Sequence, residues 1–350
     1  MRENRNVARL LTPPRLPRSV GAVPPADRHA ASPHFRDGVF HNTEPASVLA
    51  EESRFRLARD FARKGRSGRP SAPIPLVTPS ALDDAARCAA TWLGHATVLF
   101  ELDGHWVLAD PVWSPRVSPF TSVGPKRHHP VPLPLAGLPA LSAVVISHDH
   151  YDHLDLRTVE WLTSHQRMPF VVPLGIGAHL RAWGVPEDRI VELDWEESHP
   201  VGEVTITCTE ARHFSGRWLR NNTSLWSSWV LAGPEHRIFF GGDTGYAAAF
   251  AGIGEQHGPF DLTVLPIGAY DHRWPDIHMD PIEALRSHRD LHGGVLLPIH
   301  WATFDLAFHP WAEPVERLTS EAGAATLALP RPGERFDVRG ALPTTPWWRG

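Results

Sequence analysis

Short apolar runs alternate with polar connections rich in Gly and Pro along most of the chain. Short runs of this kind predict strands, and apolar positions that recur every three to four residues predict helices. The strongest signal is a hairpin, because residues 96–102 and 106–110 flank an Asp103-Gly104 turn. Further strands are predicted for residues 141–146, 170–173, 204–209, 224–231, 237–241, 262–267 and 295–299.

Helices are predicted for residues 156–165, for residues 175–183, and from Asp280 to about Leu291. The third helix has a common start signal, in which Asp280 is followed by Pro at the first helical position and by Glu283. Hairpins followed by mixed strands and helices predict an α+β fold. We expect a four-layer αββα sandwich, in which two mixed sheets pack face to face and are flanked by helices.

The first 75 residues differ from the rest in pattern and charge. Residues 1–45 lack a sustained apolar period, so we expect them to be extended or partly disordered. Residues 46–64 predict a basic amphipathic helix, and residues 65–75 a linker. We therefore divide the chain into an N-terminal extension, 1–75, and a main domain, 76–350. The extension either packs on the main domain or on a second subunit of a homodimer, or it contacts anionic lipid headgroups.

Composition narrows the function classes. The chain has 350 residues and a net charge of −5, while residues 1–70 carry 14 Lys and Arg against 7 Asp and Glu, so the remainder is strongly acidic. This acidic remainder argues against a nucleic-acid partner. The two cysteines, Cys88 and Cys208, exclude a disulfide framework, and we find neither a membrane-spanning run nor a secretory signal. We expect a cytoplasmic protein, with peripheral contact at the inner face of the membrane as the role open to the extension.

The candidate chemistry begins directly after the strand predicted for residues 141–146. Four side chains that can bind metals follow within a few positions: His148, His150, Asp152 and His153. On an extended backbone His148, His150 and Asp152 share one face, and His153 joins them only if the chain turns there. Clustering imidazoles and carboxylates is costly unless a cation offsets the loss of hydration. The alternative is a polar loop rich in His by chance, in a chain with 22 His.

Three more residues of the same kind follow other predicted strands. His213 comes after residues 204–209, Asp243 after residues 237–241, and His300 after residues 295–299. Taken singly, each is more commonly a core or loop residue than a ligand. Together they indicate a metal site where several strand ends converge.

These motifs resemble those of the metallo-β-lactamase fold superfamily. More narrowly, the chain is similar to the N-acylphosphatidylethanolamine-hydrolysing phospholipase D branch and its bacterial relatives. The resemblance runs in unbroken order from about Thr91 to Phe304. It is carried by residues 91–97, 124–127, 147–155, 213–217, 240–246, 266–270 and 299–301.

The resemblance implies two zinc ions and seven ligands. One ion would be held by His148, His150 and His213, and the other by Asp152, His153 and His300. Asp243 would bridge the two ions, together with a water or hydroxide. Iron or manganese would tolerate the same nitrogen and oxygen donors.

The resemblance further implies a phosphodiesterase of phospholipase D type that acts on N-acylphosphatidylethanolamine-like phospholipids, with Asp152 and Asp243 in the catalytic centre. Tyr151 and His278 would lie at the substrate, and His278 could protonate a leaving group. Packing is the alternative for Tyr151, and a place in a helix-start loop for His278. Asp110, at the end of the hairpin, is expected to orient a ligand histidine, or else to form an Asp-Pro turn.

Two other functions remain open. The first is a lactonase or another metallo-hydrolase of a small phosphorylated metabolite, and the second is a non-catalytic module that binds metal or lipid. The full set of seven ligands favours an enzyme, because a decayed site would have lost at least one of them. The expected partner is therefore a phospholipid or a small phosphorylated substrate.

Overall fold

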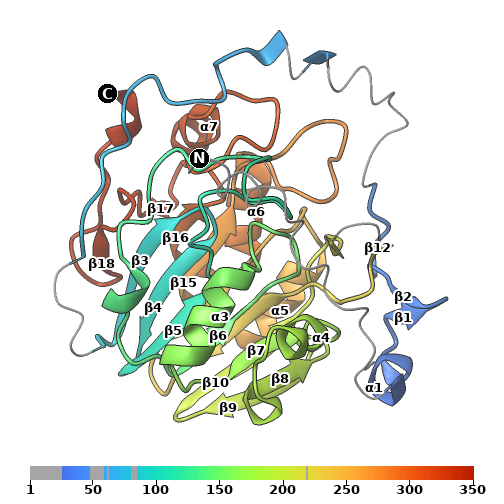
Figure 1. Ribbon diagram of the computed structural model, residues 1–350. Helices are drawn as coiled ribbons and strands as arrows, with labels where there is room; N and C mark the ends of the chain where they lie inside the picture. Colours follow the sequence, from blue (N-terminus) through green and yellow to red (C-terminus); the bar gives the residue numbers. More distant parts are fainter. Residues whose placement is uncertain (1–25, 48–58, 61–62, 80–84, 218–219) are drawn as a thin grey trace, which may run out of the picture.

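The computed structural model describes residues 26–47, 59–60, 63–79, 85–217 and 220–350. Two seven-stranded sheets pack against each other, with helices on both outer sides (Figure 1). The first sheet has the spatial order β17 (Thr326–Leu327), β16 (Gly293–Ile299), β15 (Phe260–Pro266), β14 (Arg237–Phe240), β13 (Ser228–Ala232), β10 (Val204–Thr209) and β9 (Ser198–Val201). The second has the order β18 (Arg335–Asp337), β3 (Cys88–Gly94), β4 (Thr97–Leu102), β5 (His105–Ala109), β6 (Ala143–Val145), β7 (Phe170–Pro173) and β8 (Ile190–Leu193).

Both sheets are mixed. Strands β14 to β17 are parallel and β9 to β14 antiparallel, while β5 to β8 are parallel and β18 to β5 antiparallel. The helices that cover the sheets are α3 (Leu156–His165), α4 (Gly177–Ala182), α5 (Ala249–His257), α6 (Pro281–Asp290) and α7 (Glu313–Glu321). The predicted four-layer αββα sandwich is confirmed.

Alternation along the strands explains why these sequences form a sandwich. In β4, Val98 and Phe100 face the core between the sheets, whereas Leu99 faces the layer under α3 and α4. The same alternation separates Val107 from Leu108 in β5. Since both faces of such a strand are buried, its sequence is apolar almost throughout. Cys208 lies in the core between the sheets.

The predicted elements agree closely with the structure, with one clear correction. The hairpin, the strands 170–173 and 204–209, and the helix 156–165 are confirmed. The helix after Asp280 is confirmed too, and Asp280 and Glu283 form a reciprocal capping box. The strand predicted for 224–231 is wrong in its first half, because β13 begins only at Ser228. Residues 225 and 227 bond instead to the backbone of Leu174 and Ser147, beyond the ends of β7 and β6.

The N-terminal extension is ordered where the structure describes it. Residues 26–47 form α1 (Ala26–Ala31) and a small hairpin of β1 (Phe35–Arg36) and β2 (Val39–Phe40), and Phe40 is fully buried in the main core. The prediction of disorder is therefore wrong for residues 26–45. Most of the helix predicted for 46–64 lies outside the described residues, although 59–60 and 63–64 are helical. The division of the chain at residue 75 stays a prediction.

Two shorter features complete the fold. Strands β11 (Gly216–Arg217) and β12 (Arg220–Asn221) pair with each other outside the main sheets. Three single-turn helices lie in the loops and at the C-terminus: η1 (Leu135–Gly137), η2 (Glu187–Arg189) and η3 (Trp347–Arg349). Among the helices of the described residues, none has the length and apolarity needed to cross a membrane.

Candidate metal centre

The site forms where strands of both sheets end. His148 follows β6, His213 follows β10, Asp243 follows β14 and His300 follows β16. Because parallel neighbours end at the same edge, β14 and β16 bring Asp243 and His300 to one side of the sandwich. The loop after β6 faces them from the other sheet, and Ser147 at its start accepts a backbone hydrogen bond from Ser227.

The first group of side chains is His148, His150 and His213. Nε2 of His148 lies 2.8 Å from Nδ1 of His150, and Nε2 of His213 lies 3.4 Å from the same atom. Neighbouring groups fix the ring orientations: Nδ1 of His213 donates to the Ile277 carbonyl at 2.8 Å, and Nδ1 of His148 lies 3.0 Å from the Ser147 hydroxyl. Three ring nitrogens therefore face a common point.

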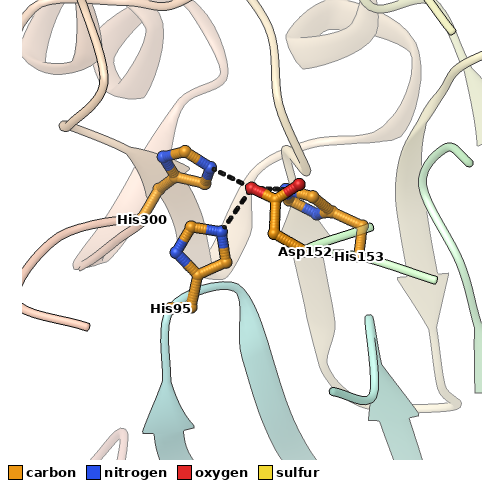
Figure 2. Close-up of side chains that lie close together, drawn as sticks. All are labelled: His95, Asp152, His153 and His300. Carbon is orange, nitrogen blue, oxygen red and sulfur yellow. Dashed lines mark hydrogen bonds and ion pairs between the residues drawn. The ribbon is translucent and has the colours of Figure 1, made fainter. Parts of the chain in front are cut away.

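The second group contains Asp152, His153 and His300. Nε2 of His153 and Nε2 of His300 each lie 3.6 Å from Oδ2 of Asp152 (Figure 2). The extended backbone expected through Asp152 is wrong, because the chain turns at residue 151 and the His153 amide donates to the His150 carbonyl. This turn separates Asp152 from His148 and His150 and directs it to the second group.

Asp243 lies between the two groups. Its Oδ2 is 3.1 Å from Nε2 of both His153 and His300, and 4.0 Å from Nε2 of both His148 and His213. The carboxylate is 2% exposed. One oxygen atom therefore contacts both groups, which is the position that a bridging ligand would need.

The donor set fits metal ions. Nε2 of His153, both ring nitrogens of His300 and Oδ1 of Asp243 are buried, and none has a hydrogen-bond partner among the described residues. Buried polar atoms without partners are costly, and a bound cation would offset that cost. Within each of several overlapping sets of these residues, the ligand atoms lie within 4.8 Å of one another. The cluster can therefore hold metal ions through nitrogen and oxygen donors.

The pKa shifts within the cluster also favour a bound cation. Burial alone would lower the pKa of the imidazoles of His153 and His300, but Asp243 and Asp152 outweigh it. The pKa of His153 is raised well above its usual value, and that of His300 to about 9. Burial would raise the pKa of the two carboxyls, yet the histidines hold it well below the usual range. The two carboxylates therefore favour positive charge at His153 and His300, as they would favour a bound cation.

Asp110 lies directly behind His153. It is fully buried, and its Oδ2 accepts from Nδ1 of His153 at 2.6 Å and from the Ser147 hydroxyl at 2.6 Å, while Oδ1 accepts from the Ser147 amide at 2.7 Å. Because Nδ1 of His153 donates to Asp110, Nε2 is free of its proton when the ring is neutral and faces the cluster.

The two residues expected at the substrate lie at the rim. Nδ1 of His278 is 3.8 Å from Oδ2 of Asp243, and the side chain is 13% exposed. Tyr151 is partly buried against Val112, Val117 and Phe304, and the guanidinium of Arg217 lies 4.0 Å from its ring centroid. Packing of Tyr151 is therefore observed, and its contact with substrate stays a prediction.

Two residues at the cluster had no role assigned from the sequence. His95 lies in the turn between β3 and β4, and its Nε2 is 2.9 Å from Oδ2 of Asp152. Asn42 belongs to the extension, and its side chain bonds to both the amide and the carbonyl of His213, at 3.1 Å and 2.7 Å. The motif around residues 91–97 could have pointed to His95, whereas no local signal marks Asn42.

Known proteins are similar to this chain in sequence and in fold. Residues 105–301 match the family described as the β-lactamase superfamily domain. The chain belongs to the metallo-β-lactamase superfamily. N-acyl-phosphatidylethanolamine-hydrolyzing phospholipase D 1 of Caenorhabditis elegans is 39% identical over 246 residues, which cover 67% of this chain and 69% of that protein. The chain therefore belongs to the branch of this superfamily that contains the N-acylphosphatidylethanolamine-hydrolysing phospholipases D.

Two further proteins are similar to this chain. An uncharacterized protein of Mycobacterium tuberculosis is 58% identical over 327 residues, which cover 91% of this chain and 88% of that protein. The crystal structure of an isothiocyanate hydrolase from Delia radicum gut bacteria has a TM-score of 0.57 at 22% identity, and the match covers 71% of this chain and 99% of that one. At this identity the structural match supports the fold alone. The chain is thus a metallo-β-lactamase-fold hydrolase with a cluster that can bind metal ions.

Proposed function

We propose that this chain is a two-metal phosphodiesterase of phospholipase D type, which hydrolyses N-acylphosphatidylethanolamine-like phospholipids. The observation that carries the proposal is the place of Asp243, whose Oδ2 lies within 4.0 Å of ring nitrogens from both histidine groups. The activity for which the Caenorhabditis elegans relative is named supports the choice of substrate class.

His148, His150 and His213 would hold one ion, and Asp152, His153 and His300 the other, with Asp243 shared between them. Zinc suits this set of mostly imidazole donors, while iron or manganese would accept it as well. When bound, two divalent ions make a water molecule more acidic and offset negative charge on a phosphoryl group. Asp110 would keep Nε2 of His153 available for this task.

In the proposed reaction, the oxygen of water forms a bond to phosphorus while the bond from phosphorus to the ethanolamine oxygen breaks. The products are phosphatidate and N-acylethanolamine, and the departing oxygen takes up a proton. His278 lies beside Asp243 at the rim, where it could contact a phosphoryl or leaving oxygen. Burial lowers the pKa of His278 to about 4, although Asp243 acts in the opposite direction. At neutral pH its ring is therefore neutral, which favours a hydrogen-bond donor over the proton donor suggested by the sequence.

Two arginines near the rim of the site, Arg127 and Arg217, use their guanidinium groups mainly for contacts within the protein. Arg127 is buried, and its guanidinium donates to the carbonyls of Val112 and Ser114. Arg217 uses Nη1 for the carbonyls of Asp149 and Leu154 and stacks on Tyr151. Both therefore support the loops around the site, and Arg217 in addition holds the ring of Tyr151 at the rim. Peripheral membrane contact, a homodimer and the cytoplasmic location stay predictions.

The test is hydrolysis of a defined N-acylphosphatidylethanolamine in mixed micelles by zinc-loaded protein. We expect release of N-acylethanolamine and phosphatidate, and about two zinc ions per chain by elemental analysis. Asp243→Asn should bind less zinc, and its turnover should fall by at least about 10³-fold, which corresponds to about 4 kcal/mol in activation free energy. The exposed Asp188→Asn serves as the control, because Asp188 lies in η2 at the surface.

Other results of this assay would favour the small-metabolite hydrolase or contradict the two-metal proposal. Zinc-loaded protein that leaves the lipid intact but opens a phosphorylated sugar lactone would contradict the phosphodiesterase and support the small-metabolite hydrolase. Protein that hydrolyses the lipid at full rate after its metal has been removed by chelation would contradict the two-metal proposal itself.

A further inference from the structure

His95 occupies a backbone conformation that only a specific surrounding would maintain. It follows Gly94 in the tight turn between β3 and β4, and both residues have positive φ, 105° for Gly94 and 54° for His95. A non-glycine residue in the left-handed region is uncommon and is often found at functional sites. The conformation is held from outside the hairpin, because the His95 amide donates to the Thr303 hydroxyl at 2.7 Å.

The same turn is bonded to the strand end that carries His300. The His95 carbonyl accepts a hydrogen bond from the His300 amide at 3.0 Å, and it also accepts from the Trp92 indole at 2.8 Å. His300 itself has a positive φ of 64°. The backbones of His95 and His300 are therefore fixed to each other, although 205 positions separate them in the sequence.

The side chain of His95 reaches the carboxylate of the second group. It is 1% exposed, and its Nε2 lies 2.9 Å from Oδ2 of Asp152, the same oxygen that faces His153 and His300 (Figure 2). The ring centroids of His95 and His300 are 4.0 Å apart, and the edge of Phe304 closes the other side at 5.0 Å. The imidazole is thus enclosed, with Asp152 as its hydrogen-bond partner.

This geometry has a direct consequence for the ligand atoms. A neutral imidazole carries one N–H, and a carboxylate oxygen at 2.9 Å is a partner for a donor, so Nε2 carries the proton. A protonated ring nitrogen cannot bind a metal. His95 therefore belongs behind Asp152 and not among the ligands, even though its Nε2 lies close enough to Asp152, His153 and His300 to be counted with them.

We propose that His95 is a positioning residue for the metal ion held by Asp152, His153 and His300. Through its side chain it fixes the direction of the Asp152 carboxylate, and through its carbonyl it fixes the strand end of His300. Two ligands of the same ion are then in place before the ion binds, which raises affinity because less ordering is needed on binding. This inference rests on the proposed two-metal function and concerns only one of its two sites.

The chain allows a sharp pair of variants. His95→Gln places an amide N–H at about the reach of Nε2, whereas the side chain of His95→Asn is one carbon shorter, by about 1.5 Å, and cannot reach Asp152. Asn also tolerates a positive φ, so the turn should remain intact. A matched control is His236, an equally buried histidine whose Nδ1 lies 2.6 Å from Asp103, in a pair outside the cluster. His236→Asn removes a histidine–aspartate pair without touching the metal ligands.

The measurement is zinc affinity, determined by competition with a chromogenic chelator, with stoichiometry from elemental analysis. Removing a hydrogen bond to a metal ligand typically costs 10–100-fold in affinity. We expect His95→Asn to weaken one of the two zinc ions by about this factor, His95→Gln to restore most of it, and His236→Asn to match wild type. In an Asp152→Ala background, His95→Asn should add little further loss, because the carboxylate that His95 contacts is already absent.

Each contrary result has a definite meaning. Wild-type affinity in His95→Asn, or losses that simply add in the Asp152→Ala background, would overturn the positioning role. Equal losses in His95→Asn and His95→Gln would overturn it as well and indicate that the ring nitrogen binds metal directly. Wild-type protein that binds no zinc contradicts the proposed function, whereas two tightly bound zinc ions in both wild type and His95→Asn contradict this inference alone.

Discussion

The replacement Asp110→Asn tests how strongly buried support controls the metal centre. The carboxylate of Asp110 accepts three hydrogen bonds at 2.6 to 2.7 Å, from the Ser147 amide, the Ser147 hydroxyl and Nδ1 of His153. The amide of Asn would turn an NH₂ group toward at least one of these donors. Since hydrogen bonds to a charged group contribute about 1.5–3 kcal/mol each, we expect a loss of about 2–4 kcal/mol in the free energy of unfolding.

Zinc affinity should fall as well. His153 depends on Asp110 to keep its Nδ1–H donating and its Nε2 directed at the cluster. Loss of such a partner typically lowers metal affinity by 10–100-fold, or about 1.4–2.7 kcal/mol. The assays are urea unfolding of the metal-free protein and chelator competition for zinc.

Asp103→Asn provides the matched control. Asp103 also accepts three hydrogen bonds, from the amides of Glu235 and His236 and from Nδ1 of His236 at 2.6 Å, and its side chain is 7% exposed. Both aspartates have positive φ, 39° for Asp110 and 45° for Asp103, which Asn tolerates. Asp103→Asn should lose comparable stability and keep wild-type zinc affinity. Equal zinc affinity in the two variants would refute the reasoning, because it would mean that the Asp110 contact supports the fold alone.

Three further predictions follow from the site. His278→Ala should keep its zinc but lose about 10²-fold in kcat on lipid, because it removes a donor at the rim, and an unchanged kcat would contradict this role. Asn42→Ala should lower zinc affinity, measured by chelator competition, because it frees the backbone of His213, whereas an unaffected affinity would mean that β10 holds His213 alone. Zinc affinity should rise with pH from about 6.5 to about 9, because carboxylates outweigh burial and raise the pKa of His300 to about 9, so binding must displace its proton. Calorimetry in buffers of different ionisation enthalpy measures that proton, and zero release would contradict the prediction.

The fold was largely predictable because its strands carry their own signal. Residues 170–173 form an apolar run, as expected of a strand buried on both faces, and residues 204–209 alternate Val, Ile and Cys with Thr. Both segments are strands with the predicted bounds. The start of α6 was equally predictable, because Asp280, Pro281 and Glu283 act locally on the first helical turn. The segment 224–227 was misread because the backbone amides of Leu225 and Ser227 bond to Leu174 and Ser147, just beyond strand ends of the other sheet, and not to a neighbouring strand.

The sequence indicated the members of the candidate site and, through Asp110, only part of their support. The spacing of His148, His150, Asp152 and His153, and the place of His213, Asp243 and His300 after strands, indicated a metal cluster from sequence alone. His95 and Asn42 received no role, because each acts through a contact with a residue more than 50 positions away. Nothing near Asn42 in the sequence distinguishes such a contact from ordinary polarity, whereas His95 lies within the motif at residues 91–97.

The sequence by itself therefore determined the elements, their layers and the residues with metal-binding chemistry, because these depend on local patterns of polarity and on residue type. The family resemblance implied that the seven residues divide into two groups around Asp243, and only the tertiary structure decided which of their atoms face one another. It also decided that residues 26–47 pack against the main core and that the turn of His95 is bonded to the strand end of His300. Such contacts depend on how distant segments meet in space, and hydrogen bonds between them leave no periodic trace along the chain.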